Sequence, residues 1–282
     1  MTPEQLTCIK ENLSWNTISV EPLSGGSCNE IYRVSNQKEN VVIKLADQRQ
    51  FPELLLREKE GLVALRQTNT FRIPDIFAYF KDDATAYLHM EWIPSTHSSP
   101  GYNQRFGQKL AELHKNTYNT FGWHTSNYIG QLGQDNTFKE SPVEFYIQNR
   151  LEPQFRMASQ KGFQFSGISD LYAVATSVIP DEPPALVHGD LWSGNAMCSG
   201  QNEPCLIDPA VSYAPREMDI ALMKLFGGFN TAVFTTYQEI YPLASGWHNR
   251  MLLWQLYYYL VHVNLFGSSY AANVQRCIDA YV

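Results

Sequence analysis

The stretch that decides the fold is His188-Gly189-Asp190-Leu191-Trp192-Ser193-Gly194-Asn195. The apolar pair Leu186-Val187 before it predicts a short buried strand, and the chain is expected to turn out of that strand toward Asp190. Asn195 opens a predicted hairpin that turns through 199–203 and returns along Cys205-Leu206-Ile207. Asp208 ends this hairpin, so we expect its side chain to lie beside Asn195.

The spacing within this segment is typical of phosphoryl transfer. Four residues separate Asp190 from Asn195, as in the pattern H-x-D-x-x-x-x-N of kinase catalytic loops. Transfer from ATP needs a carboxylate that accepts the proton of the acceptor hydroxyl, and it needs oxygen ligands for Mg²⁺. We therefore predict that Asp190 is the base and that Asn195 and Asp208 hold Mg²⁺. An ordinary junction of loop and strand is the structural alternative for the His-Gly-Asp tripeptide alone.

The first third of the chain predicts a small antiparallel sheet accompanied by helices. Helices are expected over Pro3–Leu13 and over Phe51–Gln67, where a proline stands in the first turn. The runs rich in β-branched and aromatic residues that predict the strands are Ile18–Leu23, Ile31–Val34, Val41–Leu45, Ile76–Phe80 and Thr85–Ile93.

Glu58 is the one carboxylate that the helix 51–67 is predicted to direct inward. With a rotation of about 100° per residue, Glu58 falls in the middle of the stripe formed by the leucines of this helix. A buried carboxylate needs a partner, and Lys44 on the preceding strand is best placed to supply one. We expect Lys44 to contact the α and β phosphates of ATP and Glu58 to fix it through an ion pair. The alternative is a surface pair of little energetic consequence.

Two further segments are predicted to contact the nucleotide. The turn containing Gly25, Gly26 and Ser27 allows close approach of backbone N–H groups to phosphates, although such a turn is also common in plain hairpins. Met90-Glu91-Trp92-Ile93 is expected to supply apolar walls and backbone hydrogen bonds for adenine, although a buried strand has the same composition.

The spacing of apolar residues in the remainder of the chain predicts mainly helices. Pro94 to Gly101 predicts a linker, and helical spacing follows over Phe106–Leu113, Val143–Gln154 and Ile168–Val178 and again after Glu217. A stretch rich in Gly, Asn and Gln over Gly122–Thr137 predicts a loop between the first two of these helices. The sequence thus predicts an α+β, bilobal, protein-kinase-like fold in which a five-stranded antiparallel lobe with one main helix precedes a larger helical lobe. The expected division is a nucleotide-binding lobe over 1–93, a hinge over 94–101 and a catalytic and substrate lobe over 102–282.

Two residues are predicted to support the catalytic loop. His188 opens the loop, and Asp219 lies at the start of a predicted helix where it is expected to hydrogen-bond the loop backbone. Asp219 could instead cap that helix. His114, at the end of a predicted helix, is expected to be a core or terminal histidine and is assigned no chemistry.

Composition excludes several other classes of protein. The 282 residues are 44% hydrophobic and carry a net charge of −7, which suits a globular enzyme and gives no basic surface for nucleic acid. The longest apolar run, Leu252 to Phe266, is too short and too polar to cross a membrane, and it predicts a buried core helix. The first residues lack the features of a signal peptide, so we expect a cytoplasmic protein. Five cysteines without metal-binding spacing predict reduced thiols. The sequence leaves the oligomeric state open.

Strings spread nearly from end to end of the chain carry a resemblance to a known family. They are Leu23-Ser-Gly-Gly-Ser-Cys-Asn-Glu30, His188-Gly-Asp-Leu-Trp-Ser-Gly-Asn195, Ile207-Asp-Pro-Ala-Val211 with Tyr213, Arg216-Glu-Met-Asp219, Leu225-Phe-Gly-Gly-Phe229 and His262-Val-Asn-Leu-Phe-Gly267. They resemble the fructosamine or ketosamine kinases, within the group that also contains aminoglycoside phosphotransferases and choline kinases.

The resemblance implies ATP-dependent phosphorylation of a sugar hydroxyl in a ketoamine, free or on a protein lysine, as part of deglycation. It also implies a set of acceptor-site residues: Trp192, Gln134, Asn136, Tyr213 and Arg216. Two alternatives stay open at this point. One is a kinase for an aminoglycoside, an aminoalcohol or another sugar, and the other is a nucleotide-binding pseudokinase that acts as an interaction module.

Overall fold

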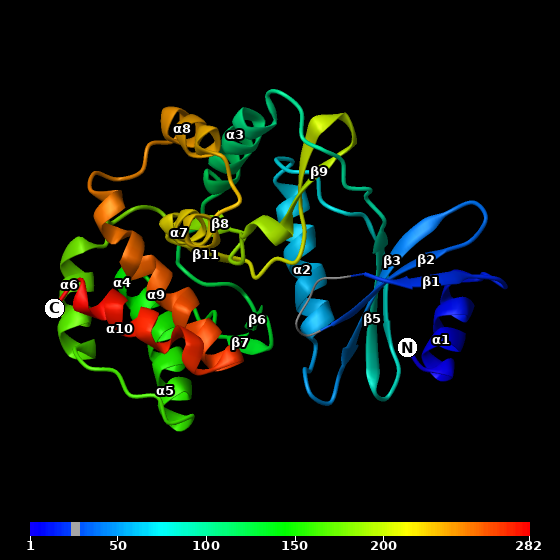
Figure 1. Ribbon diagram of the computed structural model, residues 1–282, viewed down its shortest axis with the longest axis horizontal. Helices are drawn as coiled ribbons and strands as arrows, with labels where there is room; N and C mark the ends of the chain where they lie inside the picture. Colours follow the sequence, from blue (N-terminus) through cyan, green and yellow to red (C-terminus); the bar gives the residue numbers. More distant parts are fainter. Residues whose placement is uncertain (24–28) are drawn as a thin grey trace.

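The computed structural model describes residues 1–23 and 29–282 and shows a small lobe built on one sheet and a larger helical lobe (Figure 1). The small lobe contains β1 (Ser19–Pro22), β2 (Glu30–Ser35), β3 (Asn40–Asp47), β4 (Ile76–Lys81), β5 (Thr85–Glu91), α1 (Pro3–Leu13) and α2 (Leu54–Gln67).

As predicted, the sheet of the small lobe has five antiparallel strands, and the structure shows their order to be β1-β2-β3-β5-β4. Successive side chains of a strand point to opposite faces. On one face Ile43 and Tyr87 pack with Ile9 of α1. On the other face Val42 and Leu88 pack with the leucines of α2. Lys44 shares the second face with Val42, and this alternation directs it toward α2.

The main helix of the small lobe begins later than the sequence predicts. Residue Glu53 has a left-handed backbone, with φ of +60°, so a continuous helix from Phe51 is interrupted there. The preceding residues form turns in which the carboxylate of Asp47 accepts hydrogen bonds from the N–H groups of Arg49 and Gln50. The regular helix is therefore confined to Leu54–Gln67.

The segment between β5 and the first helix of the large lobe has no regular structure, and it includes the predicted hinge over 94–101. The helical segments of the large lobe are α3 (Tyr102–His114), α4 (Pro142–Glu144), η1 (Phe145–Leu151), α5 (Glu152–Gln160), α6 (Ile168–Val178), α7 (Glu217–Phe226), α8 (Thr231–Ile240), α9 (Trp247–Phe266), η4 (Ser268–Tyr270) and α10 (Ala271–Asp279). Its strands and short turns are β6 (Asn127–Ile129), β7 (Leu132–Gln134), β8 (Ala185–Val187), η2 (Ser193–Asn195), β9 (Ala196–Ser199), η3 (Gly200–Asn202), β10 (Glu203–Leu206) and β11 (Ser212–Ala214).

Two parts of the large lobe differ from the prediction. The segment predicted as a loop over 122–137 contains the short antiparallel hairpin of β6 and β7. The helix predicted over 143–154 runs from Pro142 to Gln160, and its middle, η1, is π-helical. Strands of three residues are too short to leave a period-two pattern in the sequence, so the hairpin of β6 and β7 had no clear signal.

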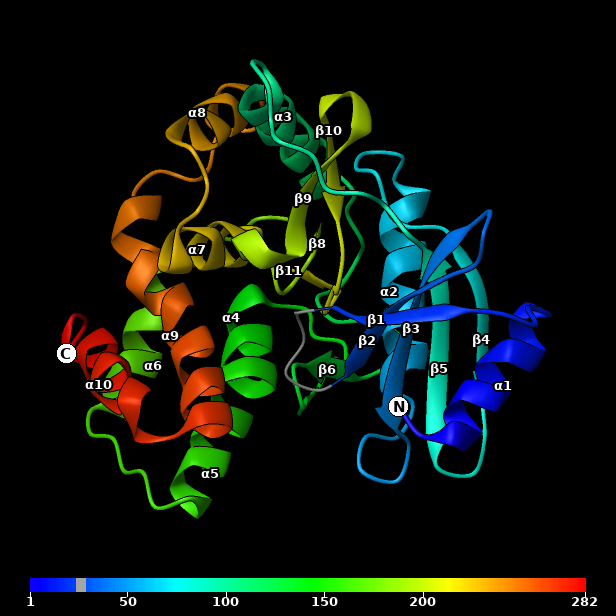
Figure 2. The same ribbon diagram turned by 45° about the vertical axis from the view of Figure 1, so that its right-hand side comes forward.

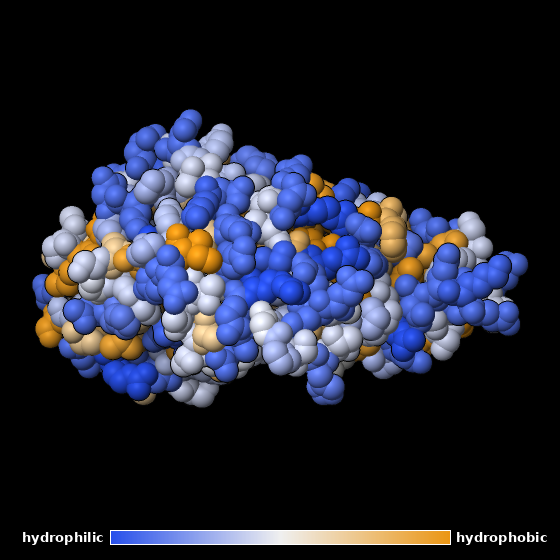
Figure 3. Space-filling view, turned by 90° about the horizontal axis from the view of Figure 1, so that it is seen from above, coloured by the Kyte–Doolittle hydropathy of each residue, from blue (hydrophilic) through white to orange (hydrophobic). Residues whose placement is uncertain are grey.

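The core of the large lobe is organised around α9, which lies beside α7 and α10 in both ribbon views (Figure 2). The run 252–266, predicted as a buried helix, lies within α9 and contributes Leu253, Leu256 and Leu260 to the core. Among the described residues, none of the helices has the length and apolar composition required to span a bilayer. The face seen from above is largely hydrophilic, with apolar residues in small separate groups (Figure 3).

Candidate active site

The segment that leaves β8 makes a turn that requires glycine. Gly189 has φ of +83°, and a Cβ atom added there would lie 2.1 Å from the backbone oxygen of Ala210. The same two segments are joined by a hydrogen bond of 2.9 Å from the N–H of Ala210 to the carbonyl of His188. The turn therefore fixes where Asp190 leaves the strand.

The structure brings Asp190, Asn195 and Asp208 together. The side-chain amide of Asn195 donates to the carbonyl oxygen of Asp190 at 2.8 Å and to its carboxylate at 3.2 Å. The hairpin of β9 and β10 then returns the chain, and the N–H of Ile207 donates to the carbonyl of Asn195 at 3.1 Å. Asp208 follows with a left-handed backbone, φ +57°, which is uncommon outside glycine and costs on the order of 1 kcal/mol or more. Strained residues of this kind cluster at functional sites.

Lys44 and Glu58 form the ion pair that the sequence predicts. The Lys44 ammonium lies 2.6 Å from the Glu58 carboxylate, and the two residues are only 3% and 9% exposed. The ammonium also contacts the carboxylate of Asp208, from the other lobe. No local pattern predicts this second contact, because Asp208 is 164 residues away along the chain.

The charges of this cluster alter one another's protonation. Burial alone lowers the pKa of Lys44, but the carboxylates of Asp208 and Glu58 raise it above its ordinary value, so the ammonium stays charged. Loss of solvation and the nearby Asp208 carboxylate raise the pKa of Asp190 to about 7, against the opposing hydrogen bond from Asn195. A carboxylate with this pKa can exchange protons near neutrality, as a general base must.

Asp219 hydrogen-bonds the backbone of the predicted catalytic loop. Its two carboxylate oxygens accept the N–H groups of His188 at 2.8 Å and of Gly189 at 2.9 Å. The ring of His188 in turn contacts the carbonyl of Ile207 at 2.9 Å, which links the loop to the returning hairpin. Both residues predicted to support the loop thus lie where that role needs them.

His114 is a supporting residue that sequence reasoning missed. Its Nε2 lies 3.2 Å from Asp219 and its Nδ1 lies 2.9 Å from the hydroxyl of Tyr237. The hydroxyl of Tyr237 is contacted by Arg216 at 3.2 Å. With the proton of His114 on Nε2, each group in the series from Arg216 to Asp219 donates to the next, so this buried series is fully satisfied. A lone histidine at a helix end carries no sequence signal for such a contact.

A cavity of about 370 Å³ lies between the lobes at this cluster. Its polar lining includes Arg57, Glu58, Asp190, Asn195 and Asp208. Its apolar and aromatic lining comes mainly from Trp192 and from the end of α7 and of α9, with Phe226, Tyr258, Val261, His262, Leu265 and Phe266. The predicted base and metal ligands therefore face a space of the size of a small ligand.

Several predicted acceptor-site residues lie outside the lining of this cavity. Gln134 and Asn136 are 4% and 1% exposed, and their amides bond to Asn127 and to backbone carbonyls within the protein. Arg216 is ion-paired with Glu182. None of these side chains lines the cavity, because internal hydrogen bonds already use their polar groups.

Tyr213 also lies outside the cavity lining, whereas Trp192 belongs to it. Tyr213 stacks on Tyr118, with ring centroids 4.9 Å apart, and packs beside Trp123. Trp192 is 42% exposed at the cavity. Of the five predicted acceptor-site residues, Trp192 alone retains a placement that fits the prediction.

Arg57, Phe226, His262 and Phe266 are four of the cavity residues that sequence reasoning missed. Three of them stand in the strings that carried the family resemblance, so a signal was present without an assigned role. The ring of His262 contacts the carbonyl of Tyr258 at 2.8 Å, and burial lowers its pKa. Since a carbonyl only accepts, Nδ1 carries the proton and Nε2 of the neutral ring is left as an acceptor.

The predicted nucleotide-binding residues are placed as follows. Gly25, Gly26 and Ser27 lie outside the described residues. Met90 and Ile93 are buried, the carboxylate of Glu91 pairs with Arg72, and the guanidinium of Arg33 lies 5.1 Å from the ring of Trp92. The segment Met90 to Ile93 borders the lobes' junction but lies outside the lining of the cavity described above. Its contact with adenine therefore stays a prediction.

The donor set fits a magnesium ion that shares its coordination with phosphates. Mg²⁺ is usually bound in such sites by one or two protein oxygen ligands, with substrate phosphates and water completing an octahedron. Asp208 offers a carboxylate and Asn195 an amide oxygen, since its amide nitrogen faces Asp190. Within the described parts of the chain no group of three or more His, Cys, Asp or Glu residues could hold a metal alone.

Comparisons with known proteins give matches that cover most of this chain. The model of the fructosamine kinase family matches residues 2–282. The probable ketoamine kinase of Enterococcus faecium is 36% identical over 270 residues, which are 93% of this chain and 95% of that protein. The chloroplastic protein-ribulosamine 3-kinase of Arabidopsis thaliana is 35% identical over 243 residues, 82% of this chain and 73% of that protein.

Solved structures agree with the sequence relatives. The crystal structure of a protein from Haemophilus somnus assigned as a fructosamine-3-kinase superposes with a TM-score of 0.88 at 25% identity, covering 98% of this chain and 96% of that one. An aminoglycoside phosphotransferase, with a TM-score of 0.65 at 11% identity, covers 98% of this chain and 99% of its own and shows the shared kinase-like fold alone. The chain therefore belongs to the fructosamine kinase family.

Proposed function

We propose that this protein is an ATP-dependent kinase that phosphorylates a sugar hydroxyl of ketoamines. The observation that carries the proposal is the meeting of Asp190, Asn195 and Asp208 at the wall of the interlobe cavity, beside the buried Lys44–Glu58 pair. Relatives that align over most of this chain are named as ketoamine and protein-ribulosamine kinases. Both the constellation and the relatives support the same reaction class.

Each residue of the cluster has a definable task in this reaction. Asp190 accepts the proton of the attacking sugar hydroxyl, and the oxygen of that hydroxyl forms its bond to the γ-phosphorus as the bond to ADP breaks. Lys44, held by Glu58, contacts the α and β phosphates. Asn195 orients the Asp190 carboxylate through its amide nitrogen and, together with Asp208, offers oxygen atoms to Mg²⁺. When bound there, Mg²⁺ neutralises the charge of the phosphates.

The acceptor side of the cavity suits a polar sugar attached to a less polar amine. Asp190 and the free Nε2 of His262 can hydrogen-bond sugar hydroxyls, whereas the Arg57 guanidinium is already paired with Glu53 and Glu60. Trp192 offers a partly exposed aromatic face at the same cavity. The role we infer is deglycation, in which phosphorylation of the adduct makes it less stable. An enzyme that consumes ATP in this way is expected to work in the cytoplasm.

A substrate screen tests the proposed function. The protein is incubated with Mg·ATP and with free and protein-bound fructosamines, ribulosamines and erythrulosamines, and phosphorylated product is followed by mass spectrometry. We expect phosphorylation of at least one ketoamine. An aminoglycoside or aminoalcohol that is phosphorylated while every ketoamine is inert would favour the other kinase activity. Binding of ATP without turnover on any acceptor would favour the pseudokinase.

The pH profile of kcat/KM should show an acid limb set by Asp190. Its pKa is raised to about 7 by loss of solvation and by Asp208, and only the ionised carboxylate can accept a proton. Because kcat/KM reports the free enzyme, activity should rise as the pH increases through about 7 and then level off. Initial rates with Mg·ATP and ketoamine both below their KM, measured over a pH series, check this. A flat profile across the neutral range would contradict the assignment of Asp190.

A further inference from the structure

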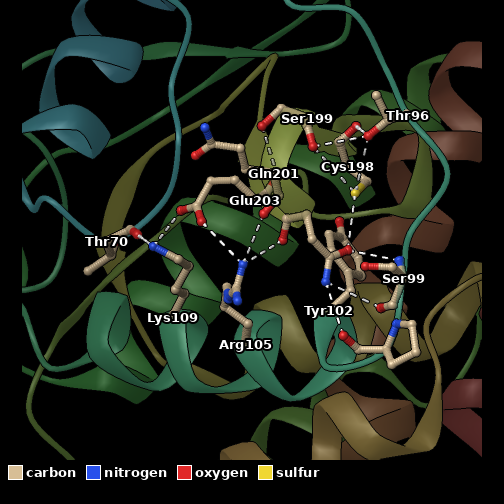
Figure 4. Close-up of polar contacts among 12 residues, drawn as sticks. Thr70, Thr96, Ser99, Tyr102, Arg105, Lys109, Cys198, Ser199, Gln201 and Glu203 are labelled. Carbon is tan, nitrogen blue, oxygen red and sulfur yellow. Dashed lines mark hydrogen bonds and ion pairs between the residues drawn. The ribbon is translucent and has the colours of Figure 1, made fainter.

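The β9–β10 hairpin connects the predicted metal ligands to the interlobe linker. Asn195 precedes β9 and Asp208 follows β10, so both lie at the base of the hairpin. Its opposite end, η3, reaches the linker and α3 (Figure 4). A displacement of the linker can therefore be transmitted along the hairpin to its base.

Three successive carbonyls of β9 are used by donors from the linker and from α3. The hydroxyl of Tyr102 donates to the carbonyl of Met197 at 3.0 Å, and the N–H of Thr96 donates to that of Cys198 at 2.7 Å. The hydroxyl of Thr96 donates to the carbonyl of Ser199 at 3.0 Å. The linker and α3 are thus fastened to β9 by one backbone hydrogen bond and by two side-chain hydroxyls.

Asn202 joins the tip of the hairpin to the linker through its side chain. Its amide oxygen accepts the N–H of Ser99 at 2.8 Å, and its amide nitrogen donates to the carbonyls of Ser99 and Pro100 at 3.3 Å each. Its backbone is left-handed, with φ of +61°, a conformation that asparagine tolerates better than most residues. The neighbouring Gln201 is also left-handed, with φ of +64°, but its side chain makes no hydrogen bond within the described part of the chain.

The other edge of the hairpin is attached to the small lobe. Arg72 lies in the segment between α2 and β4. Its N–H donates to the carbonyl of Pro204 at 3.0 Å, and the carbonyl of Arg72 accepts the N–H of Leu206 at 3.0 Å. Glu203 pairs with Lys109 of α3 at 2.8 Å, and Figure 4 shows both side chains pointing toward each other. The hairpin is therefore held by both lobes and by the linker between them.

We infer that Asn202 is a positioning residue, which clamps the linker to the hairpin so that Asn195 and Asp208 keep the separation that magnesium needs. This inference rests on the proposed function for the role of magnesium. The contacts that carry it do not depend on the identity of the acceptor. Asn202 lies at the end of the hairpin opposite to the reacting groups, so it acts through the hairpin and not by contact with the substrate.

The variant Asn202→Gly tests the inference while keeping the left-handed backbone, which glycine adopts freely. The loss of its side-chain hydrogen bonds should raise the Mg²⁺ concentration for half-maximal activity about 3- to 10-fold at saturating ATP. The KM for the ketoamine should not change. By hydrogen exchange, the amide of Ser99 and also that of Ile207, at the far end of the hairpin, should exchange faster than in the unchanged protein.

Gln201→Gly is the matched control, because it makes the same change one position earlier without removing a hydrogen-bonded side chain. It should leave the Mg²⁺ dependence and the exchange of Ile207 unchanged. Thr96→Val provides a second test: it removes the hydroxyl that binds Ser199 in a side chain of similar shape and should act in the same direction as Asn202→Gly.

The outcomes separate the inference from the proposed function. Faster exchange confined to Ser99, with an unchanged Mg²⁺ dependence, would overturn the clamp. So would an equal loss of every kinetic parameter together with a fall in Tm, since that is the result of a merely structural role. If the unchanged protein phosphorylates no ketoamine, the proposed function fails. The exchange of Ile207 and the Mg²⁺-dependent binding of a non-hydrolysable ATP analogue, measured by calorimetry, then still decide the inference.

Discussion

Asp190→Asn is expected to lower kcat for ketoamine phosphorylation about 10²-fold or more, the range attributed to a positioned general base. Asparagine has the same shape and can keep the contact with the amide of Asn195, but it cannot accept the proton of the sugar hydroxyl. The KM for ATP should change little, because the lost group acts on the acceptor hydroxyl. Steady-state kinetics at saturating Mg·ATP measure the effect.

Asp170→Asn is the control for this variant, since Asp170 is an exposed carboxylate in the first turn of α6. It should leave kcat unchanged. The acid limb of the pH profile should also disappear in Asp190→Asn, because no titrating base remains at that position. If the Asp190→Asn variant keeps more than roughly a tenth of the original kcat, the loss is smaller than removal of a general base usually causes, and Asp190 is not the base.

The local parts of the site could be predicted from the sequence because short spacings determine them. The separation of Asp190 from Asn195 and the return of Asp208 at the end of a hairpin depend only on strand and turn geometry within about twenty residues. The pairing of Lys44 with Glu58 followed from the helical phase of Glu58 and its apolar neighbours. The five-stranded antiparallel sheet was predicted by the same kind of local pattern.

Contacts between distant segments could not be predicted in this way. The contact of Asp208 with Lys44 depends on how the two lobes meet, and the contact of His114 with Asp219 depends on where the end of α3 lies relative to the start of α7. The burial of Gln134 and Asn136 was missed for a related reason. Polar residues are usually exposed, and only the complete fold shows that internal partners satisfy them.

Asp208→Asn is expected to lower kcat/KM for Mg·ATP by roughly 10²–10³-fold, the usual cost of removing one group that stabilises charge in the transition state. The carboxylate is the only anionic side chain of the predicted metal pair, and an amide is a weaker ligand for Mg²⁺. Lys44 also loses one of its two carboxylate partners. Both changes should raise the Mg²⁺ concentration that gives half-maximal activity. Rates measured over a Mg²⁺ series at fixed ATP check this.

The pH profile of the same variant shows which of these two roles dominates. The negative charge of Asp208 raises the pKa of Asp190, so its removal should lower that pKa and move the acid limb of kcat/KM to lower pH. Asp83→Asn, an exposed change in the turn between β4 and β5, should move neither the acid limb nor the Mg²⁺ dependence. If Asp208→Asn shifts the acid limb but leaves the Mg²⁺ dependence unchanged, Asp208 acts through Lys44 and Asp190 and is not the metal ligand. If the acid limb and the Mg²⁺ dependence both change, the Asp208 carboxylate binds the metal and also raises the pKa of Asp190.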